Sequence, residues 1–214
     1  MAVIAPTILT NDAGKYRLFI EAYYHFARRI QVDISDGIFT PNKTISEVGI
    51  WWPSGWKCDI HMMVTAPSEH VDALKTLHPH LVIFHAEVTE DLTPSLMRLK
   101  DAGIKIGIAL QKTSFPGRYS DLIRFVDHVL LFSGNLGSYG GEADLLQLEK
   151  IDVIRGINPD VEIGWDGGAK IDNVREIARG GVDVINVGSA IAAAEKPREI
   201  FEIMSAEARR GSEL

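Results

Sequence analysis

The chain has 214 residues, 46% hydrophobic and 24% charged, which is enough to bury a large core. Its formal net charge of −7 argues against a nucleic-acid groove, because binding a phosphate backbone needs a basic surface. The single cysteine excludes an internal disulfide, no apolar run approaches the roughly 20 residues of a membrane span, and MAVIAPTILT lacks the basic start of a signal peptide, so we expect a cytoplasmic protein without a membrane partner.

Short β-rich runs alternate with amphipathic helical patterns along the chain. In chain order, the sequence predicts strand 3–9, helix 15–26, strand 30–34, strand 58–64, helix 68–77, strand 81–85, helix 93–102, strand 105–110, helix 119–125, strand 128–132, helix 143–154, strand 162–165, helix 171–179, strand 183–187 and helix 197–210. Turn-forming Pro and Gly residues separate several of these elements.

Several predicted strands are continuous apolar blocks, such as LVIF, VLLF and VDVINV. Strands of this kind are covered on both faces and belong to parallel sheets. Eight such strands with intervening helices predict an α/β protein, a compact (β/α)8 barrel that forms a single domain over residues 1–214. An open doubly wound sheet is the alternative, and the lack of a G-x-G-x-x-G turn after any strand counts against it.

Polar side chains stand at the carboxyl ends of several predicted strands, where such a barrel carries its chemistry. Gln31 and Asp33 share one face of the second strand, His61 lies on the third, and Asp166 follows the seventh. If these faces point inward, the four side chains converge on one mouth, and the two aspartates approach it from different sides. A lone aspartate at a strand end often only caps a turn, which is our interpretation of Asp36.

Other residues have less specific patterns. His85 is equally consistent with a core residue and with a ligand. Met63 is a candidate for an apolar floor under a ligand. The remaining histidines are expected on the surface or in loops, and the tryptophans near residue 50 in packing or a subunit contact: His25, His70, His78, His80, His128, Trp51, Trp52 and Trp56.

Glycine-rich segments follow the last strands. DGG follows the seventh strand with Gly167 and Gly168, and VGSAI ends the eighth with Gly188 and Ser189. Loops at these positions commonly bind phosphate in barrels, because glycine lets backbone N–H groups approach the oxygens. The GSYGG segment, residues 137–141, is a third candidate contributor. Tight turns alone are the alternative explanation.

These segments together resemble the ribulose-phosphate 3-epimerase family over nearly the whole chain. VDISDGIFTPNKTI is similar to the family pattern V-D-x-M-D-G-x-F-x-P-N-x-T-I, DIHMMV to D-x-H-L-M, FHAEVTED to H-x-E-A-T, and NLGSYGGE to N-P-G-F-G-G-Q with one extra residue. APTILT resembles the first strand, with Thr7 where serine is usual.

The resemblance implies an isomerase that inverts C3 of a phosphorylated ketose, D-ribulose 5-phosphate to D-xylulose 5-phosphate, through an enediolate. It implies Asp33 and Asp166 as acid and base. It also implies a divalent metal (Zn, Mn, Fe or Mg) held at Gln31, Asp33, His61 and Asp166, where the first ligand is histidine in the family. Further implied contacts with a small phosphorylated sugar are Thr7, His61, Gly137, Tyr139, Gly140, Gly141, Gly167, Gly168, Gly188 and Ser189. The family generally self-associates, which implies a homo-oligomer.

The amide at position 31 leaves several hypotheses open. Loss of a histidine ligand should weaken zinc binding and favour oxygen-preferring ions such as manganese or magnesium. Alternatively, Gln31 acts as a plain hydrogen-bond donor without a tightly bound metal. The chain could also act on another ketose phosphate such as allulose 6-phosphate, or bind a sugar phosphate without turnover. A hexulose-phosphate synthase is disfavoured, because DIHMMV lacks that group's D-x-K-x-x-D.

Overall fold

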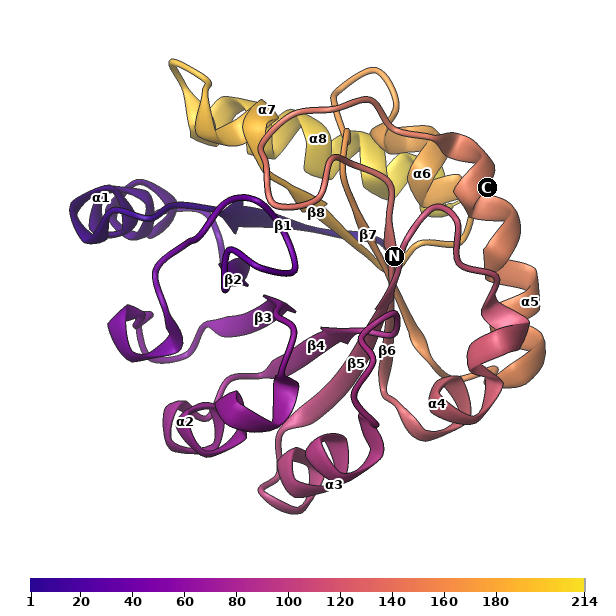
Figure 1. Cartoon of the computed structure of the whole chain (residues 1–214). Coiled ribbons are helices and arrows are strands. Elements are labelled where there is room, and N and C mark those ends of the chain that lie inside the picture. The colour runs from indigo at the N-terminus through magenta and orange to yellow at the C-terminus, as the bar shows by residue number, and fades with distance from the viewer. Residues whose placement is uncertain (214) are drawn as a thin grey trace.

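The computed structural model describes residues 1–213, which form a closed barrel of eight parallel strands in the order β1 to β8 (Figure 1). The strands are β1 Val3–Ile8, β2 Arg29–Ser35, β3 Lys57–Met63, β4 Leu81–His85, β5 Lys105–Leu110, β6 His128–Phe132, β7 Glu162–Asp166 and β8 Val184–Val187. The predicted (β/α)8 barrel is therefore confirmed.

Helices surround the strands in chain order (Figure 1). They are α1 Ala13–Tyr23, α2 Val71–Leu77, α3 Thr93–Asp101, α4 Ser120–Phe125, α5 Lys150–Ile157, α6 Val174–Arg179, α7 Ser189–Ala192 and α8 Pro197–Ser212. The helix predicted at 143–154 is displaced, because a 3-10 segment, Leu145–Glu149, precedes α5 and is capped by Asp144. No helix within residues 1–213 is both long and apolar enough to cross a bilayer.

Two apolar layers explain the continuous hydrophobic strands. Alternate residues such as Ile30, Val32 and Ile34 pack outward into the main core between barrel and helices. A separate cluster fills the barrel interior and consists of Leu81, Ile83, Ala109 and Leu130. The barrel interior is thus packed with apolar side chains, and its polar inward-facing side chains lie at the two ends of this cluster.

The amino-terminal end of the barrel holds a buried ionic network. Arg29 Nε lies 2.6 Å from Asp59 Oδ2, and Arg29 Nη2 lies 2.7 Å from Glu162 Oε2. His128 Nδ1 lies 2.8 Å from the same glutamate oxygen. Burial alone would raise the pKa of Glu162, but its hydrogen bonds from Arg29 and His128 hold that pKa well below the usual range. The network ties β2, β3, β6 and β7 together at the end opposite the strand carboxyl termini.

The expectation that His128 lies on the surface or in a loop is wrong. Its side chain is buried inside β6, because it is the partner of Glu162 in this network. Asp59 shares the inward face of β3 with His61, but it faces the opposite end of the barrel. Trp56 is buried, whereas Trp51 is 45% exposed, and self-association stays a prediction.

Candidate active site

Four buried side chains meet at the carboxyl end of the barrel. Gln31 Nε2 donates hydrogen bonds to Asp33 Oδ1 at 2.9 Å and to Asp166 Oδ2 at 2.6 Å. His61 Nδ1 lies 3.2 Å from the same Asp33 oxygen and 3.7 Å from the same Asp166 oxygen. The convergence predicted from strand parity is therefore present in the structure.

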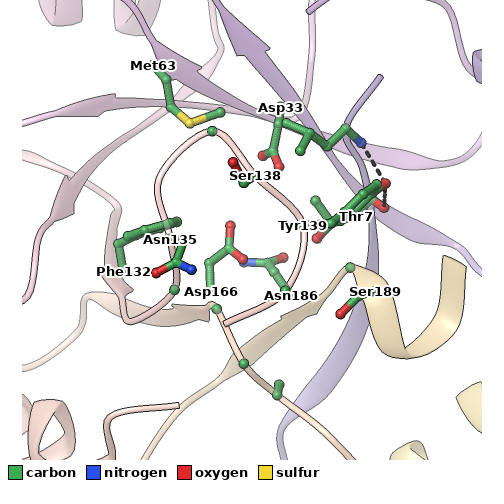
Figure 2. A pocket seen from close by; sticks show the side chains of 18 residues that line it. Thr7, Asp33, Met63, Phe132, Asn135, Ser138, Tyr139, Asp166, Asn186 and Ser189 are labelled. Carbon is green, nitrogen blue, oxygen red and sulfur yellow. Dashed lines mark hydrogen bonds between the residues drawn. The ribbon is translucent and has the colours of Figure 1, made fainter. Parts of the chain in front are cut away.

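Strand register explains why these residues meet. Asp33 on β2 and His61 on β3 are direct register partners, so their inward side chains lie side by side. Asp166 ends β7, which reaches β2 around the ring through β8 and β1. Figure 2 shows the carboxylates of Asp33 and Asp166 turned toward one another across the pocket.

Burial and like charge set the electrostatics of the pair. Burial, reinforced by the charge of Asp33, raises the pKa of Asp166 to about 7. Burial alone would lower the pKa of His61, but its hydrogen bond with Asp33 and the nearby carboxylate charges raise it overall. The protonated form of Asp166 is thus favoured next to Asp33.

The Gln31 amide is oriented by these carboxylates. Because a carboxylate accepts hydrogen bonds, the amide turns its nitrogen toward both acids. Its Oε1 is then buried without a hydrogen-bond partner among the described residues. Such an orphaned oxygen is costly in a protein interior, and a half-turn of the amide would direct it toward the acids instead.

The donor set is suited to a divalent cation. Asp33, His61 and Asp166 each offer a ligand atom, and these atoms lie within 4.8 Å of one another. Two carboxylates and one imidazole are common ligands of divalent metals. Gln31 fits as a fourth ligand only through Oε1, the atom that has no partner in this arrangement.

A small cavity of about 40 Å³ opens above the two aspartates. Among the predicted substrate contacts, those that line it are Thr7, Gly137, Tyr139, Gly140, Gly167, Gly168, Gly188 and Ser189. Gln31, His61 and Gly141 do not line it; His61 is completely buried beneath the carboxylates. The cavity has room for a few water molecules and is smaller than a ketose phosphate.

The cavity is also lined by residues that are not among the predicted substrate contacts. Asn135 and Asn186 contribute polar side chains, and Phe132 contributes an aromatic wall. Asn186 is the register partner of Asp166. The alternation of side chains along β8 is the sequence signal that indicates its inward direction. Met63 also lines the cavity, as expected for an apolar floor.

The glycine after Asp166 is required by a close approach of two loops. Gly167 has a φ of +109°, and a Cβ there would lie 2.0 Å from the backbone nitrogen of Gly134. No other residue fits both the conformation and the space. The loops after β6 and β7 are consequently pressed together at the edge of the cavity.

Tyr139 closes the cavity from the side of β1. Its hydroxyl accepts the backbone N–H of Leu9 at 2.8 Å and donates to the carbonyl of Thr7 at 3.2 Å, the dashed lines of Figure 2. Its ring packs over Gly188, where a Cβ would come within 2.9 Å of two ring carbons. The segment 134–141 is therefore fastened across the mouth of the cavity.

A second histidine lies behind His61. His85 Nε2 is 2.9 Å from His61 Nε2, and His85 Nδ1 is 3.2 Å from Glu87 Oε2. Burial lowers the pKa of His85 to about 4, although the hydrogen bond with Glu87 favours its charged form. Burial would raise the pKa of Glu87, but hydrogen bonds from His85 and Ser114 hold it below its usual range. The open question about His85 is thus answered structurally: it is a buried partner of a site histidine.

A closed parallel barrel with titratable side chains gathered at the carboxyl ends of its strands is the architecture of a barrel enzyme. Comparison with known proteins specifies the kind of barrel enzyme. The chain belongs to the ribulose-phosphate 3 epimerase family, whose sequence model matches residues 3–192.

Relatives with that name cover nearly the whole chain. The ribulose-phosphate 3-epimerase of Helicobacter pylori J99 is 33% identical over 88% of this chain and 89% of its own length. The Escherichia coli K12 protein of the same name is 30% identical over 96% of this chain and 95% of its own length. Enzymes with this name are carbohydrate isomerases.

Solved structures support the fold independently. The 3-hexulose-6-phosphate synthase of Salmonella typhimurium superposes with a TM-score of 0.76, covering 98% of this chain and 99% of that chain. Its sequence identity is only 13%, so this likeness concerns the barrel alone.

Proposed function

We propose that the chain epimerises C3 of D-ribulose 5-phosphate to give D-xylulose 5-phosphate. The observation that carries the proposal is the pair Asp33 and Asp166, which line one cavity from separated strands and both contact Gln31. The names of the relatives supply the substrate class.

Epimerisation needs two proton-transfer groups on opposite faces of one carbon. The C3 hydrogen is α to the C2 carbonyl, so its removal gives a planar enediolate. One carboxylate removes the proton from one face, and the protonated partner returns a proton to the other face. Asp33 and Asp166 meet this requirement because each carboxylate reaches the cavity and one of them readily holds a proton.

The enediolate oxygens need stabilisation as negative charge develops. When bound, a divalent metal would be held by Asp33, His61 and Asp166 and would supply positive charge for these oxygens. Gln31 contributes Oε1 to that ligand set if its amide rotates, and otherwise keeps its N–H groups on the two acids. An amide oxygen in place of an imidazole favours manganese or magnesium over zinc.

The phosphate is proposed to bind at the glycine loops after β7 and β8. Gly167 and Gly168 expose backbone next to the cavity, and Gly188 and Ser189 line the same side. The helix α7 is only four residues long, so its dipole adds little, and the backbone N–H groups carry the interaction. Access requires the Tyr139 ring to leave Gly188.

The proposal is tested by incubating the purified protein in D2O with ribulose 5-phosphate or allulose 6-phosphate. Proton NMR follows loss of the C3 signal and formation of the epimer. We expect deuterium at C3 of ribulose 5-phosphate together with xylulose 5-phosphate, and slower exchange after chelation that manganese restores. Binding without C3 exchange of either sugar would contradict the proposal and indicate a non-catalytic binder.

A further inference from the structure

A linear network of hydrogen-bonded side chains leads from the site to the loop after β4. It begins at Asp33, passes through His61 and His85, and ends at Glu87, with successive contacts of 3.2, 2.9 and 3.2 Å. Both imidazole side chains are 0% exposed. Because water is excluded from these rings, each ring nitrogen must match the group that it faces.

Glu87 determines which nitrogens of this network donate and which accept. Its Oε1 accepts the backbone N–H of Gln111 at 2.8 Å and also accepts the Ser114 hydroxyl. A carboxylate that receives two donors on one oxygen is held in its ionised form, which can only accept hydrogen bonds. Glu87 Oε2 therefore calls for a proton on the nitrogen that faces it, His85 Nδ1.

The remaining protons follow from this one. A neutral imidazole carries a proton on one nitrogen, so His85 presents a lone pair at Nε2. The atom facing that lone pair is His61 Nε2 at 2.9 Å, and it must donate. A doubly protonated His85 would reverse this contact, but complete burial disfavours the charged ring.

We propose that Glu87, acting through His85, sets the tautomer of His61. In this tautomer Nε2 of His61 carries a proton, and Nδ1 is the ring nitrogen that faces the two carboxylates of the site. Both residues are positioning residues, because neither lines the cavity.

The consequence concerns cation binding. Because Nε2 keeps its proton, Nδ1 is the His61 nitrogen available to a cation, and it lies beside Asp33 Oδ1 and Asp166 Oδ2. The Gln31 amide donates to both carboxylates, and His61 Nδ1 lies within hydrogen-bond distance of Asp33 Oδ1. The tautomer therefore prepares His61 as a ligand before any cation arrives, as outer hydrogen bonds do for histidine ligands in general. This consequence rests on the proposed metal site, whereas the tautomer itself does not.

The tautomer is measured in metal-free protein labelled with 15N at histidine, by long-range 1H–15N NMR. His85→Gln identifies the His85 signals among the seven histidines. We expect a proton on Nδ1 of His85 and on Nε2 of His61. In Glu87→Gln the amide can donate to His85, so we expect a mixed or reversed pattern. Glu90→Gln, on the same loop and bonded to the Ser68 backbone, should leave the pattern unchanged.

Manganese affinity, followed by electron paramagnetic resonance, gives a second readout. We expect Glu87→Gln to weaken Mn²⁺ binding about 10- to 100-fold, and Glu90→Gln to leave it unchanged. The amide oxygen of His85→Gln still accepts from His61 Nε2, so this variant should bind Mn²⁺ more tightly than His85→Leu. This comparison remains informative if Glu87→Gln does not fold.

Three results would overturn the inference: a proton on Nε2 alone of His85 in the wild-type protein, tautomers that do not respond to Glu87→Gln, or equal Mn²⁺ affinities for the two His85 variants when the wild-type protein binds Mn²⁺. Failure of the proposed metal site looks different. In that case the wild-type protein shows the expected tautomers, these respond to Glu87→Gln, and no Mn²⁺ binds, which supports the tautomer and contradicts the cation site.

Discussion

The amide of Gln31 donates a hydrogen bond to Asp166 Oδ2 over 2.6 Å inside the barrel. The same nitrogen bonds Asp33 Oδ1 at 2.9 Å, so one neutral donor bridges two acids that repel each other when both are ionised. Position 31, where the family resemblance implies a metal ligand, thus carries a side chain that holds the two carboxylates together. We propose that the side chain at this position decides which cation the site accepts.

Replacing Gln31 by histidine should make the site prefer zinc. Gln31→His adds an imidazole beside Asp33, His61 and Asp166, and imidazole suits zinc better than an amide oxygen does. We expect zinc affinity to rise by about 10-fold or more, measured by competition with a chromophoric chelator. Asn11→His adds a histidine at an exposed position outside the site and serves as the control. Equal zinc affinities for the wild type and Gln31→His would refute this account of position 31.

The raised pKa of Asp166 predicts a pH-dependent stability in metal-free protein. Its folded pKa, about 7, lies above its ordinary value, so the folded state binds more protons between pH 4 and 7. The free energy of unfolding therefore falls as pH rises through this window, by at most about 4 kcal/mol from this group.

Asp166→Asn removes that titration. We expect the variant to gain stability relative to wild type as pH rises from 4.5 to 8, measured by urea unfolding with chelator present. Asp121→Asn, at an almost fully exposed carboxylate, is the control and should show no such trend. A stability difference between Asp166→Asn and wild type that is constant with pH would show that the pKa of Asp166 is not raised in the folded protein.

Strand parity was the part of the site that sequence could predict. Gln31 and Asp33 alternate with Ile30, Val32 and Ile34, and a buried parallel strand has only two faces, so their common direction follows from the pattern. Register partners cannot be deduced in this way. The pairing of Asp33 with His61 and of Asp166 with Asn186 depends on barrel stagger, a property of the whole sheet.

The contacts of long side chains could not be predicted from the sequence either. Nothing local indicates that the Tyr139 hydroxyl reaches the backbone of Leu9, which is 130 residues away. The burial of His128 was missed for a similar reason, since its partner Glu162 lies 34 residues further along the chain. Ionic partners neutralise a polar residue in a core, and such partners become visible only in the fold.

The ionic network at the amino-terminal end of the barrel should matter strongly for stability. Arg29→Met leaves Asp59, which is 2% exposed, without its cation. Breaking a buried pair in this way costs about 3–5 kcal/mol. Urea unfolding of Arg124→Met, which breaks an exposed pair with Asp121, provides the comparison and should change stability by less than about 1 kcal/mol. Similar losses for the two variants would contradict the importance assigned to the buried network.

The Tyr139 hydroxyl should hold the mouth of the barrel closed. Tyr139→Phe keeps the ring over Gly188 but removes the hydrogen bonds with Leu9 and Thr7. At about 0.5–1.5 kcal/mol per hydrogen bond, we expect the Leu9 amide to exchange with solvent about 2- to 12-fold faster in hydrogen-exchange measurements. Tyr119→Phe is the control, because that hydroxyl makes no hydrogen bond within residues 1–213. An unchanged exchange rate at Leu9 in Tyr139→Phe would rule out this fastening.

The central claim is that Asp33 and Asp166 serve opposite faces of the same carbon. It is tested most directly by incubating Asp33→Asn and Asp166→Asn separately with ribulose 5-phosphate and with xylulose 5-phosphate in D2O, and following C3 by NMR. We expect each variant to lose epimerisation by about 100-fold or more, and to exchange the C3 hydrogen of one epimer only, a different epimer for each variant. Exchange of the same epimer by both variants, or epimerisation near the wild-type rate by either, would contradict the claim.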